Sequence, residues 1–317
     1  MLQSIWDDVR RELDKGNMIT RLIIINIAVF VAINLVNLIL FIANGGTPSP
    51  LYQTILHFFC MSSDWKFFLT HPWGLFTSMF LHEGFFHILW NMLFLYWFGR
   101  IVGDFIGDQR ILPLYLLGGI AGGALFFISA NLLPYGAGGS FALGASAGVM
   151  AIVVAAGTIS PDYIMRLLFI GDVKLKYIVA VLVFLDLILI PRGGNTGGHF
   201  AHLGGALFGY IFVAQLRSGN DMSRPVNNIL DSISGFFERL FSGQGGRKRP
   251  KVVYRNPSKK RPRRSAKGSA ASDSGQSRGS VDQEKVDAIL DKIKQSGYDS
   301  LTAEEKEFLF NASKKKK

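Results

Sequence analysis

The sequence predicts an all-α membrane protein with six transmembrane helices, followed by a basic tail. The chain has 317 residues, is 49% hydrophobic and has a mean hydropathy of +0.27, which is too apolar for a soluble protein of this length. Its apolar residues are also gathered into long blocks. Most blocks approach the roughly 20 residues that a helix needs to cross about 30 Å of hydrocarbon.

The apolar blocks all end before Arg217. They cover residues 22–43, 85–105, 111–133, 141–159, 177–190 and 199–216. The first block is too long for the core of a signal peptide and has no small-residue cleavage site, so we expect it to remain as a span. The fifth is short, and we expect it to recruit residues 173–175. The predicted membrane domain is therefore 19–217, preceded by an N-terminal segment, 1–18.

The basic residues predict which side of the membrane each connection occupies. The N-terminal region and the connections after the second and fourth blocks hold nine Lys and Arg residues (Arg10, Arg11, Lys15, Arg21, Arg100, Arg110, Arg166, Lys174 and Lys176). The opposite side holds only Lys66 and Arg192. We therefore expect both termini to be cytoplasmic. The acidic N-terminal segment is untypical of a transit peptide, which favours a bacterial inner membrane.

The tail carries most of the positive charge. Residues 218–317 hold 22 Lys and Arg against 12 Asp and Glu, so they supply +10 of the net charge of +11. Within it we expect an amphipathic juxtamembrane helix at 218–245, a basic disordered linker at 246–280 and a small helical hairpin at 281–317. Anionic lipid is the expected partner of the linker. Nucleic acid is not expected, because no aromatic platform accompanies the charge.

Four polar side chains stand near the starts of three apolar blocks that enter the membrane from the same face. His87 and Asn91 are four residues apart on the second block, Ser146 is on the fourth and His202 is on the sixth. Each is predicted about 5–10 Å below the surface, at 1.5 Å per helical residue. Flanking glycines allow the fourth and sixth blocks to pack closely. A hydroxyl beside an imidazole at this depth favours nucleophilic catalysis inside the bilayer.

Each residue taken alone has a structural alternative. A serine beside glycines serves helix packing, a histidine can be a satisfied interior group, and an asparagine can join two helices by a hydrogen bond. Gly144 to Gly148 also matches the G-x-S-x-G turn of soluble hydrolases, but a glycine-rich loop stands where that turn needs a strand. For Asp186, in the fifth block, we favour a structural hydrogen bond over a catalytic role.

Together these residues resemble the rhomboid family of intramembrane serine proteases. The resemblance covers about residues 22–216 and rests on three motifs: HEGFFHILWN from His82 to Asn91, GAS ending at Ser146, and AHLGG from Ala201 to Gly205. One departure is Gly74 after Trp73, where the family often has arginine. The resemblance implies a six-helix rhomboid-like bundle that cleaves transmembrane protein substrates.

The resemblance also implies roles for individual residues. Ser146 would be the nucleophile and His202 its general base, in a dyad without a third acid. His87, Asn91 and the backbone N–H of Ser146 would stabilise the oxyanion. Gly144, Met150 and His199 are expected to line the site, and no metal or cofactor is expected. Two alternatives stay open: a catalytically silent binder of membrane helices, and a small-solute transporter.

Overall fold

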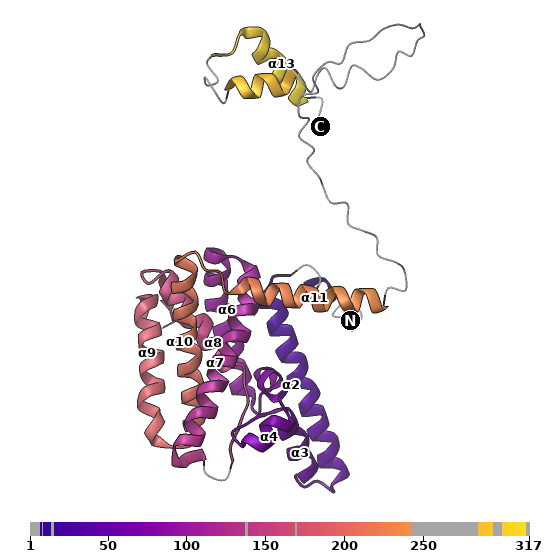
Figure 1. The fold of residues 1–317 in the computed structure, drawn as a ribbon, viewed down its shortest axis with the longest axis vertical. Helices are drawn as coiled ribbons and strands as arrows, with labels where there is room; N and C mark the ends of the chain where they lie inside the picture. The colour runs from indigo at the N-terminus through magenta and orange to yellow at the C-terminus, as the bar shows by residue number, and fades with distance from the viewer. Residues whose placement is uncertain are drawn as a thin grey trace, which may run out of the picture. The chain divides into compact units, whose positions relative to one another are not determined.

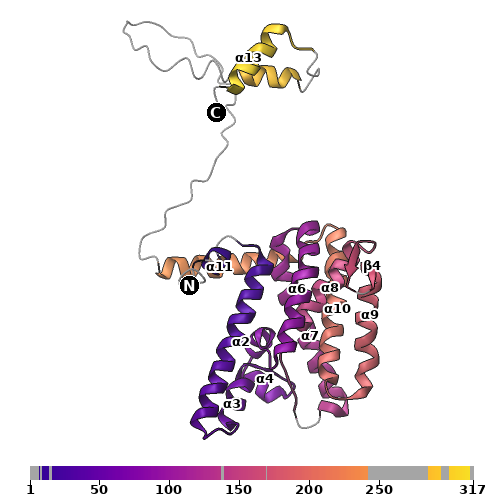
Figure 2. The same ribbon diagram turned by 180° about the vertical axis from the view of Figure 1, so that it is seen from behind.

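The computed structural model describes residues 7, 9–13, 16–136, 139–168, 170–241, 285–293 and 300–314. The chain forms two units, Met1–Arg247 and Lys248–Lys317. Figures 1 and 2 show the first unit as a bundle of long helices with α11 running across one end. The long helices of the bundle are α2 (Met18–Ala43), α6 (Phe85–Ile106), α7 (Ile111–Leu132), α8 (Ser146–Ile159), α9 (Leu175–Leu189) and α10 (Thr196–Arg217).

The long helices coincide closely with the predicted apolar blocks. Among the described residues, three helical stretches are long and apolar enough to cross a membrane: Met18–Ala43, Phe85–Ile106 and Asp108–Leu132. The helices α8 and α9 are shorter, with 14 and 15 residues. A membrane protein with these three candidate spans is thus what the structure supports, and the count of six spans stays a prediction.

The helix α8 begins later than the predicted block 141–159. Residues Phe141–Ala142 form strand β2, which pairs antiparallel with β1 (Met61–Ser62), so the helix begins only at Ser146. Every residue from Ala147 to Gly157 is buried. Because neighbouring helices surround α8, its length need not match the thickness of the hydrocarbon layer. It is the central helix of the bundle.

Glycines allow α7, α8 and α10 to approach closely. A Cβ atom on Gly205 of α10 would overlap the carbonyl oxygen of Ala147 in α8, and one on Gly209 would overlap that of Ala151. On α7 the same holds for Gly118, whose added Cβ would overlap the side chain of Ala151. The predicted close packing of the fourth and sixth apolar blocks is confirmed.

The connection between α2 and α6 folds into three short helices, α3 (Pro50–Phe59), α4 (Trp65–Thr70) and α5 (Gly74–Thr77). The indole of Trp73 donates to the carbonyl of Phe58 at 2.8 Å. A Cβ on Gly74 would overlap the carbonyl oxygen of Cys60. The close approach of this backbone explains why no larger side chain follows Trp73.

The protein is mostly helical, as predicted, and in the described part of the chain its connections add two small antiparallel sheets. Besides β1 and β2, strands β3 (Ile164–Leu167) and β4 (Gly171–Lys174) form a hairpin. The backbone groups of these connections have no helix to satisfy them, and pairing two extended segments satisfies them instead. Arg166 and Asp172, opposite each other, add an exposed ion pair at 2.9 Å.

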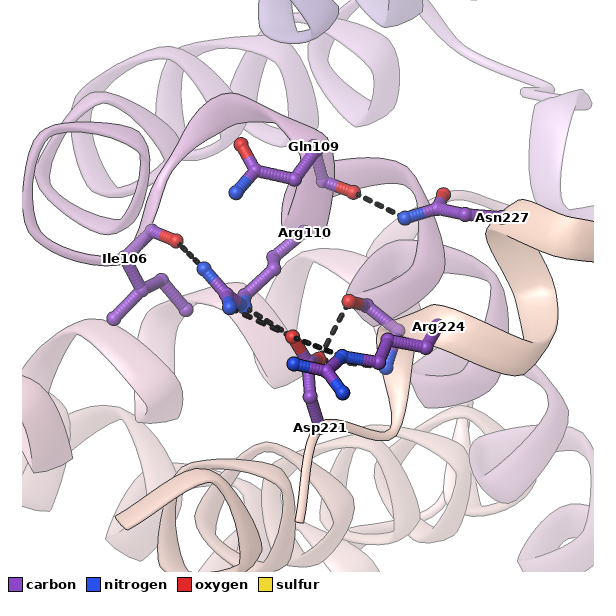
Figure 3. A network of polar contacts seen from close by, with 7 residues as sticks. Ile106, Gln109, Arg110, Asp221, Arg224 and Asn227 are labelled. Carbon is purple, nitrogen blue, oxygen red and sulfur yellow. Dashed lines mark hydrogen bonds and ion pairs between the residues drawn. The ribbon is translucent and has the colours of Figure 1, made fainter. Parts of the chain in front are cut away.

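The helix α11 (Ser223–Phe241) is held to the bundle by the polar network in Figure 3. Arg110 donates to the carboxylate of Asp221 at 2.6 Å, and Asn227 donates to the carbonyl of Gln109 at 3.1 Å. Burial alone would raise the pKa of the Asp221 carboxyl. Hydrogen bonds from Arg110 and Ser223 outweigh burial and hold that pKa at about 2. The ion pair is therefore fully formed above the usual aspartate range and is lost only as pH falls through about 2.

One face of α11 exposes large apolar side chains: Ile229, Ile233, Phe236 and Phe237. Their spacing places them on one side of the helix. The predicted linker at 246–280 lies outside the described residues. In the second unit, residues 285–293 are helical and α13 spans Ala303–Lys314. The predicted capping box is confirmed: Thr302 N–H donates to Glu305 at 2.8 Å, and Glu305 N–H donates to Thr302 Oγ1 at 3.3 Å.

Candidate active site

A cavity of about 1160 Å³ lies among α6, α7, α8, α9 and α10. The four polar residues singled out from the sequence all line it: Ser146, His202, His87 and Asn91. Gly144, Met150 and Asp186 line it as well. The structure therefore brings together side chains from segments more than a hundred residues apart in the sequence.

The turn before α8 presents Ser146 to this cavity. Gly144 has a φ of +126°, a conformation that side-chain-bearing residues rarely adopt. Its N–H donates to the carbonyl of Ser78 at 2.8 Å, and the next N–H, of Ala145, donates to His82 Nε2 at 3.4 Å. No side chain caps α8, and Ser146 is its first residue. The hydroxyl thus stands at the positive end of a helix whose first N–H groups have no capping side chain.

His87 and Asn91 face the same end of α8. A Cβ added to Gly144 would lie 2.8 Å from His87 Nε2 and 3.6 Å from Ser146 Oγ, so the imidazole lies directly beside the turn. The side-chain amide of Asn91 donates one hydrogen to the carbonyl of His87 at 2.9 Å. An amide nitrogen carries two hydrogens, so the other can serve an acceptor in the cavity.

Asp186 differs most from what the sequence led us to expect. Its carboxylate oxygen Oδ1 lies 2.8 Å from His202 Nδ1 and 2.8 Å from His199 Nδ1. The helix α9 ends at Leu189, so Asp186 lies within the last turn, at the depth of His202. The expectation that the imidazole of His202 has no acid beside it is therefore wrong. His199 contacts Asp186 and is not among the residues that line the cavity.

A signal for this contact was present in the sequence. An ionisable residue inside an apolar segment needs a partner, because an unpaired charge in hydrocarbon is costly. Asp186 lies four residues before Ile190, where the fifth apolar block ends, which is the depth at which the sixth block carries His199 and His202.

Another side chain that sequence reasoning left unassigned is His82. It is 1% exposed, its ring makes an edge contact with that of His87 at 4.9 Å, and its Nε2 accepts from Ala145. Its Nδ1 is buried without a partner among the described residues. His82 therefore supports both the turn before Ser146 and the ring of His87. Its place in the HEGFFHILWN motif was the available signal.

None of the hydrogen bonds among the described residues joins Ser146 Oγ to His202. The two side chains line one cavity without a hydrogen bond between them. Such bonds are often long in the absence of substrate and shorten when substrate binds. The Met150 side chain is 6% exposed and lines this cavity, as expected.

Asp186, His199 and His202 also have the composition of a metal site. Within the described part of the chain, each of the three offers one ligand atom, and these atoms lie within 4.8 Å of one another. Both imidazole nitrogens are at hydrogen-bonding distance from one carboxylate oxygen. Two hydrogen bonds therefore explain the spacing without an ion.

Two parts of the chain match known protein families. Residues 69–219 match the Rhomboid domain family, and residues 278–315 match a family of unknown function, DUF6576. RHOMBOID-like protein 12, mitochondrial, of Arabidopsis thaliana is 33% identical over 156 residues, which is 46% of each chain. The Presenilin-associated rhomboid-like protein, mitochondrial, of Homo sapiens is 28% identical over 169 residues, 51% of this chain and 42% of that one. The match thus spans less than half the length of these relatives.

These comparisons overturn the predicted compartment. The relatives from Arabidopsis thaliana and Homo sapiens, and a further one from Danio rerio, are named mitochondrial. The prediction of a bacterial inner membrane is therefore wrong. The acidic residues near the N-terminus, on which that prediction rested, lie outside residues 69–219 that match the family.

Proposed function

This chain belongs to the rhomboid family, and we propose that it is an intramembrane serine endopeptidase that cleaves transmembrane-helix substrates with Ser146 and His202. One observation carries the proposal. A hydroxyl at an uncapped helix start, an imidazole and two further polar side chains line a single cavity within an apolar helical bundle. In such a bundle, polar groups gathered at one depth mark a functional site.

Ser146 and His202 supply the acyl-transfer chemistry. The neutral imidazole takes the proton of Ser146 as the serine oxygen bonds to the scissile carbonyl carbon. The imidazolium then gives this proton to the leaving amine as the carbon–nitrogen bond breaks, which leaves an ester on Ser146. Water, deprotonated by the same imidazole, attacks the ester, and the proton returns to Ser146 as the acid product leaves.

The oxyanion of each tetrahedral intermediate needs donors already in place. The free amide hydrogen of Asn91, the ring of His87 and the backbone N–H of Ser146 stand around the start of α8. The positive end of the α8 dipole favours negative charge there. One such donor is worth about 10²–10³ in rate.

Substrate entry between α6 and α9 fits the surface beside the cavity. Phe86 and Trp90 on α6 and Leu185 on α9 line the cavity and are also exposed, by 70%, 54% and 42%. Exposed apolar side chains beside a polar site suit a partner that is itself an apolar helix. Near the site, such a helix must unwind to offer a peptide bond.

The basic tail has a different proposed partner. Residues 247–267 are proposed to contact anionic lipid, because they carry many positive charges.

A catalytically silent binder of membrane helices is the second candidate. The feature that favours it is the lack of a direct hydrogen bond between Ser146 and His202 among the described contacts. Both candidates accept the same partner, a membrane helix. They differ in whether the bound helix is cut.

The test uses the full chain, purified and reconstituted in liposomes with a fluorescent single-helix reporter. We expect cleavage by wild type and at least about a 10³-fold loss in Ser146→Ala and His202→Ala. Ser160→Ala, at the opposite end of α8, is the matched control and is expected to cleave like wild type. Binding of the reporter without cleavage by wild type would establish the silent binder instead.

A further inference from the structure

We propose that Asp186 is a positioning residue for His202, which holds the imidazole in the tautomer and orientation that Ser146 requires. This role rests on the proposed function, because it concerns the base of that reaction. Asp186 would thus be an acidic positioning residue beside the expected catalytic pair, Ser146 and His202. His199 takes part as a second donor to the same carboxylate.

The hydrogen bonds assign the tautomer. An ionised carboxylate only accepts, so each Nδ1 that lies 2.8 Å from Asp186 Oδ1 carries a hydrogen. A neutral imidazole with its hydrogen on Nδ1 has its lone pair on Nε2. Nε2 is then the nitrogen that can take a proton from Ser146. With the hydrogen on Nε2 instead, His202 could not act as a base toward the cavity.

The surroundings of Asp186 make this contact specific. Asp186 is 7% exposed, and the rest of α9 is almost wholly apolar. Among the described residues, the two imidazoles are its ion-pair partners within 4 Å. A carboxylate at this depth is costly without a partner, and its partners here include the proposed general base itself.

Asp186 also acts on the charge that forms during the reaction. When His202 takes the proton of Ser146, the resulting imidazolium faces a carboxylate across a 2.8 Å hydrogen bond. Attraction between opposite charges is strong where water is scarce. His199 holds the same oxygen from the preceding turn of α10, so the carboxylate is fixed between α9 and α10. The ring of His202 therefore donates to a carboxylate oxygen of Asp186 that is held in one position.

The kinetic test compares Asp186→Asn and Asp186→Ala with wild type in the liposome assay. Loss of the acid in serine proteases costs up to about 10⁴ in kcat. We expect about a 10²-fold loss of kcat here, because packing on α10 also restrains the ring, with KM changed by less than about twofold. Asp172→Asn, an exposed acid paired with Arg166, is the matched control and should keep wild-type kcat. Wild-type kcat in Asp186→Ala would overturn the role.

A spectroscopic test reads the tautomer without any cleavage. The chain has six histidines, so selective nitrogen-15 labelling gives few signals, and the His202 pair is assigned by its loss in His202→Ala. We expect a protonated Nδ1 and an unprotonated Nε2 in wild type, and a mixture of both tautomers in Asp186→Ala. An Nε2–H form in wild type, or no change on removing Asp186, would overturn the role.

Two outcomes separate the explanations further. If wild type does not cleave the reporter, the proposed function fails, and the labelled histidine signals still decide whether Asp186 sets the tautomer. If EDTA abolishes wild-type activity, the three side chains hold a metal ion, and the hydrogen-bonding role of Asp186 is overturned. We expect full activity after EDTA.

A folding control completes the test. If the thermal unfolding midpoint of Asp186→Asn is close to that of wild type, misfolding is excluded as the cause of lost activity.

Discussion

Gly205 of α10 packs directly on the carbonyl oxygen of Ala147, the residue that follows Ser146 in α8. A Cβ at position 205 would overlap that oxygen. His202 stands three residues earlier on the same helix. The distance between the two proposed catalytic side chains therefore depends on how closely these two backbones approach.

Gly205→Ala is expected to push α10 away from α8. Adding a methyl group where the backbone is in contact costs about 1–3 kcal/mol, because the neighbouring helix must move. We expect a lower thermal unfolding midpoint and at least about a tenfold loss of reporter cleavage. Gly235→Ala is the matched control, since nothing lies within 4 Å of a Cβ at that position on α11. Equal effects of the two substitutions would contradict the importance of this contact.

Gly144→Ala is expected to impair catalysis more than stability. The φ of +126° strains any side-chain-bearing residue by about 1–3 kcal/mol. A Cβ there would also lie 2.8 Å from His87 Nε2 and displace that ring from the start of α8. We expect at least about a tenfold fall in kcat, measured with the reporter. Gly84→Ala, where the added Cβ meets nothing within 4 Å, should stay near wild type; a matching loss there would argue against the proposed cause.

Asn91→Ala is expected to lower kcat by about 10²–10³, with little change in KM, because the lost donor acts on the transition state. Asn34→Ala provides the comparison. Asn34 makes the same side-chain bond to its own helix, to the carbonyl of Phe30 at 2.8 Å, but it lies on α2 and does not line the cavity. Steady-state kinetics of both variants decide the matter. A rise in KM alone for Asn91→Ala would assign this residue to substrate binding.

Cys60 is expected to resist alkylation in the folded protein. It is 1% exposed, and burial, with a further contribution from Glu83, raises the pKa of its thiol to about 12. At about pH 8 nearly all of it is therefore the unreactive thiol. Iodoacetamide should modify it at least about 10²-fold faster after denaturation. Leu69→Cys, at an exposed position of α4, is the positive control for reagent access; rapid labelling of native Cys60 would disprove its burial.

The sequence predicted those features of the fold that depend on a local pattern of residues. Continuous apolar blocks located the long helices, and glycines beside Ser146 and His202 indicated close packing of α8 and α10. It was less informative where the chain leaves the helix. The stretch from 141 to 145 is as apolar as the helix that follows, so hydropathy could not separate strand β2 from α8. That boundary depends on pairing with Met61–Ser62, far away in the sequence.

Contacts between segments set the rest of the site. Asp186 and His202 lie on different helices, and no local pattern states which face of α9 meets α10. Only the packed arrangement shows that one carboxylate oxygen serves two imidazoles. For the same reason His82 was recognised only as part of a motif, and its bond to Ala145 became visible in the fold.

The central claim, that Ser146 is a nucleophile activated by His202, is tested most directly with a fluorophosphonate probe. The full chain is treated in detergent, and the modified residue is identified by mass spectrometry. We predict a single adduct on Ser146 in wild type, none in Ser146→Ala, and labelling slowed at least about 10²-fold in His202→Ala. An adduct on another residue, or equal labelling of wild type and His202→Ala, would contradict the claim.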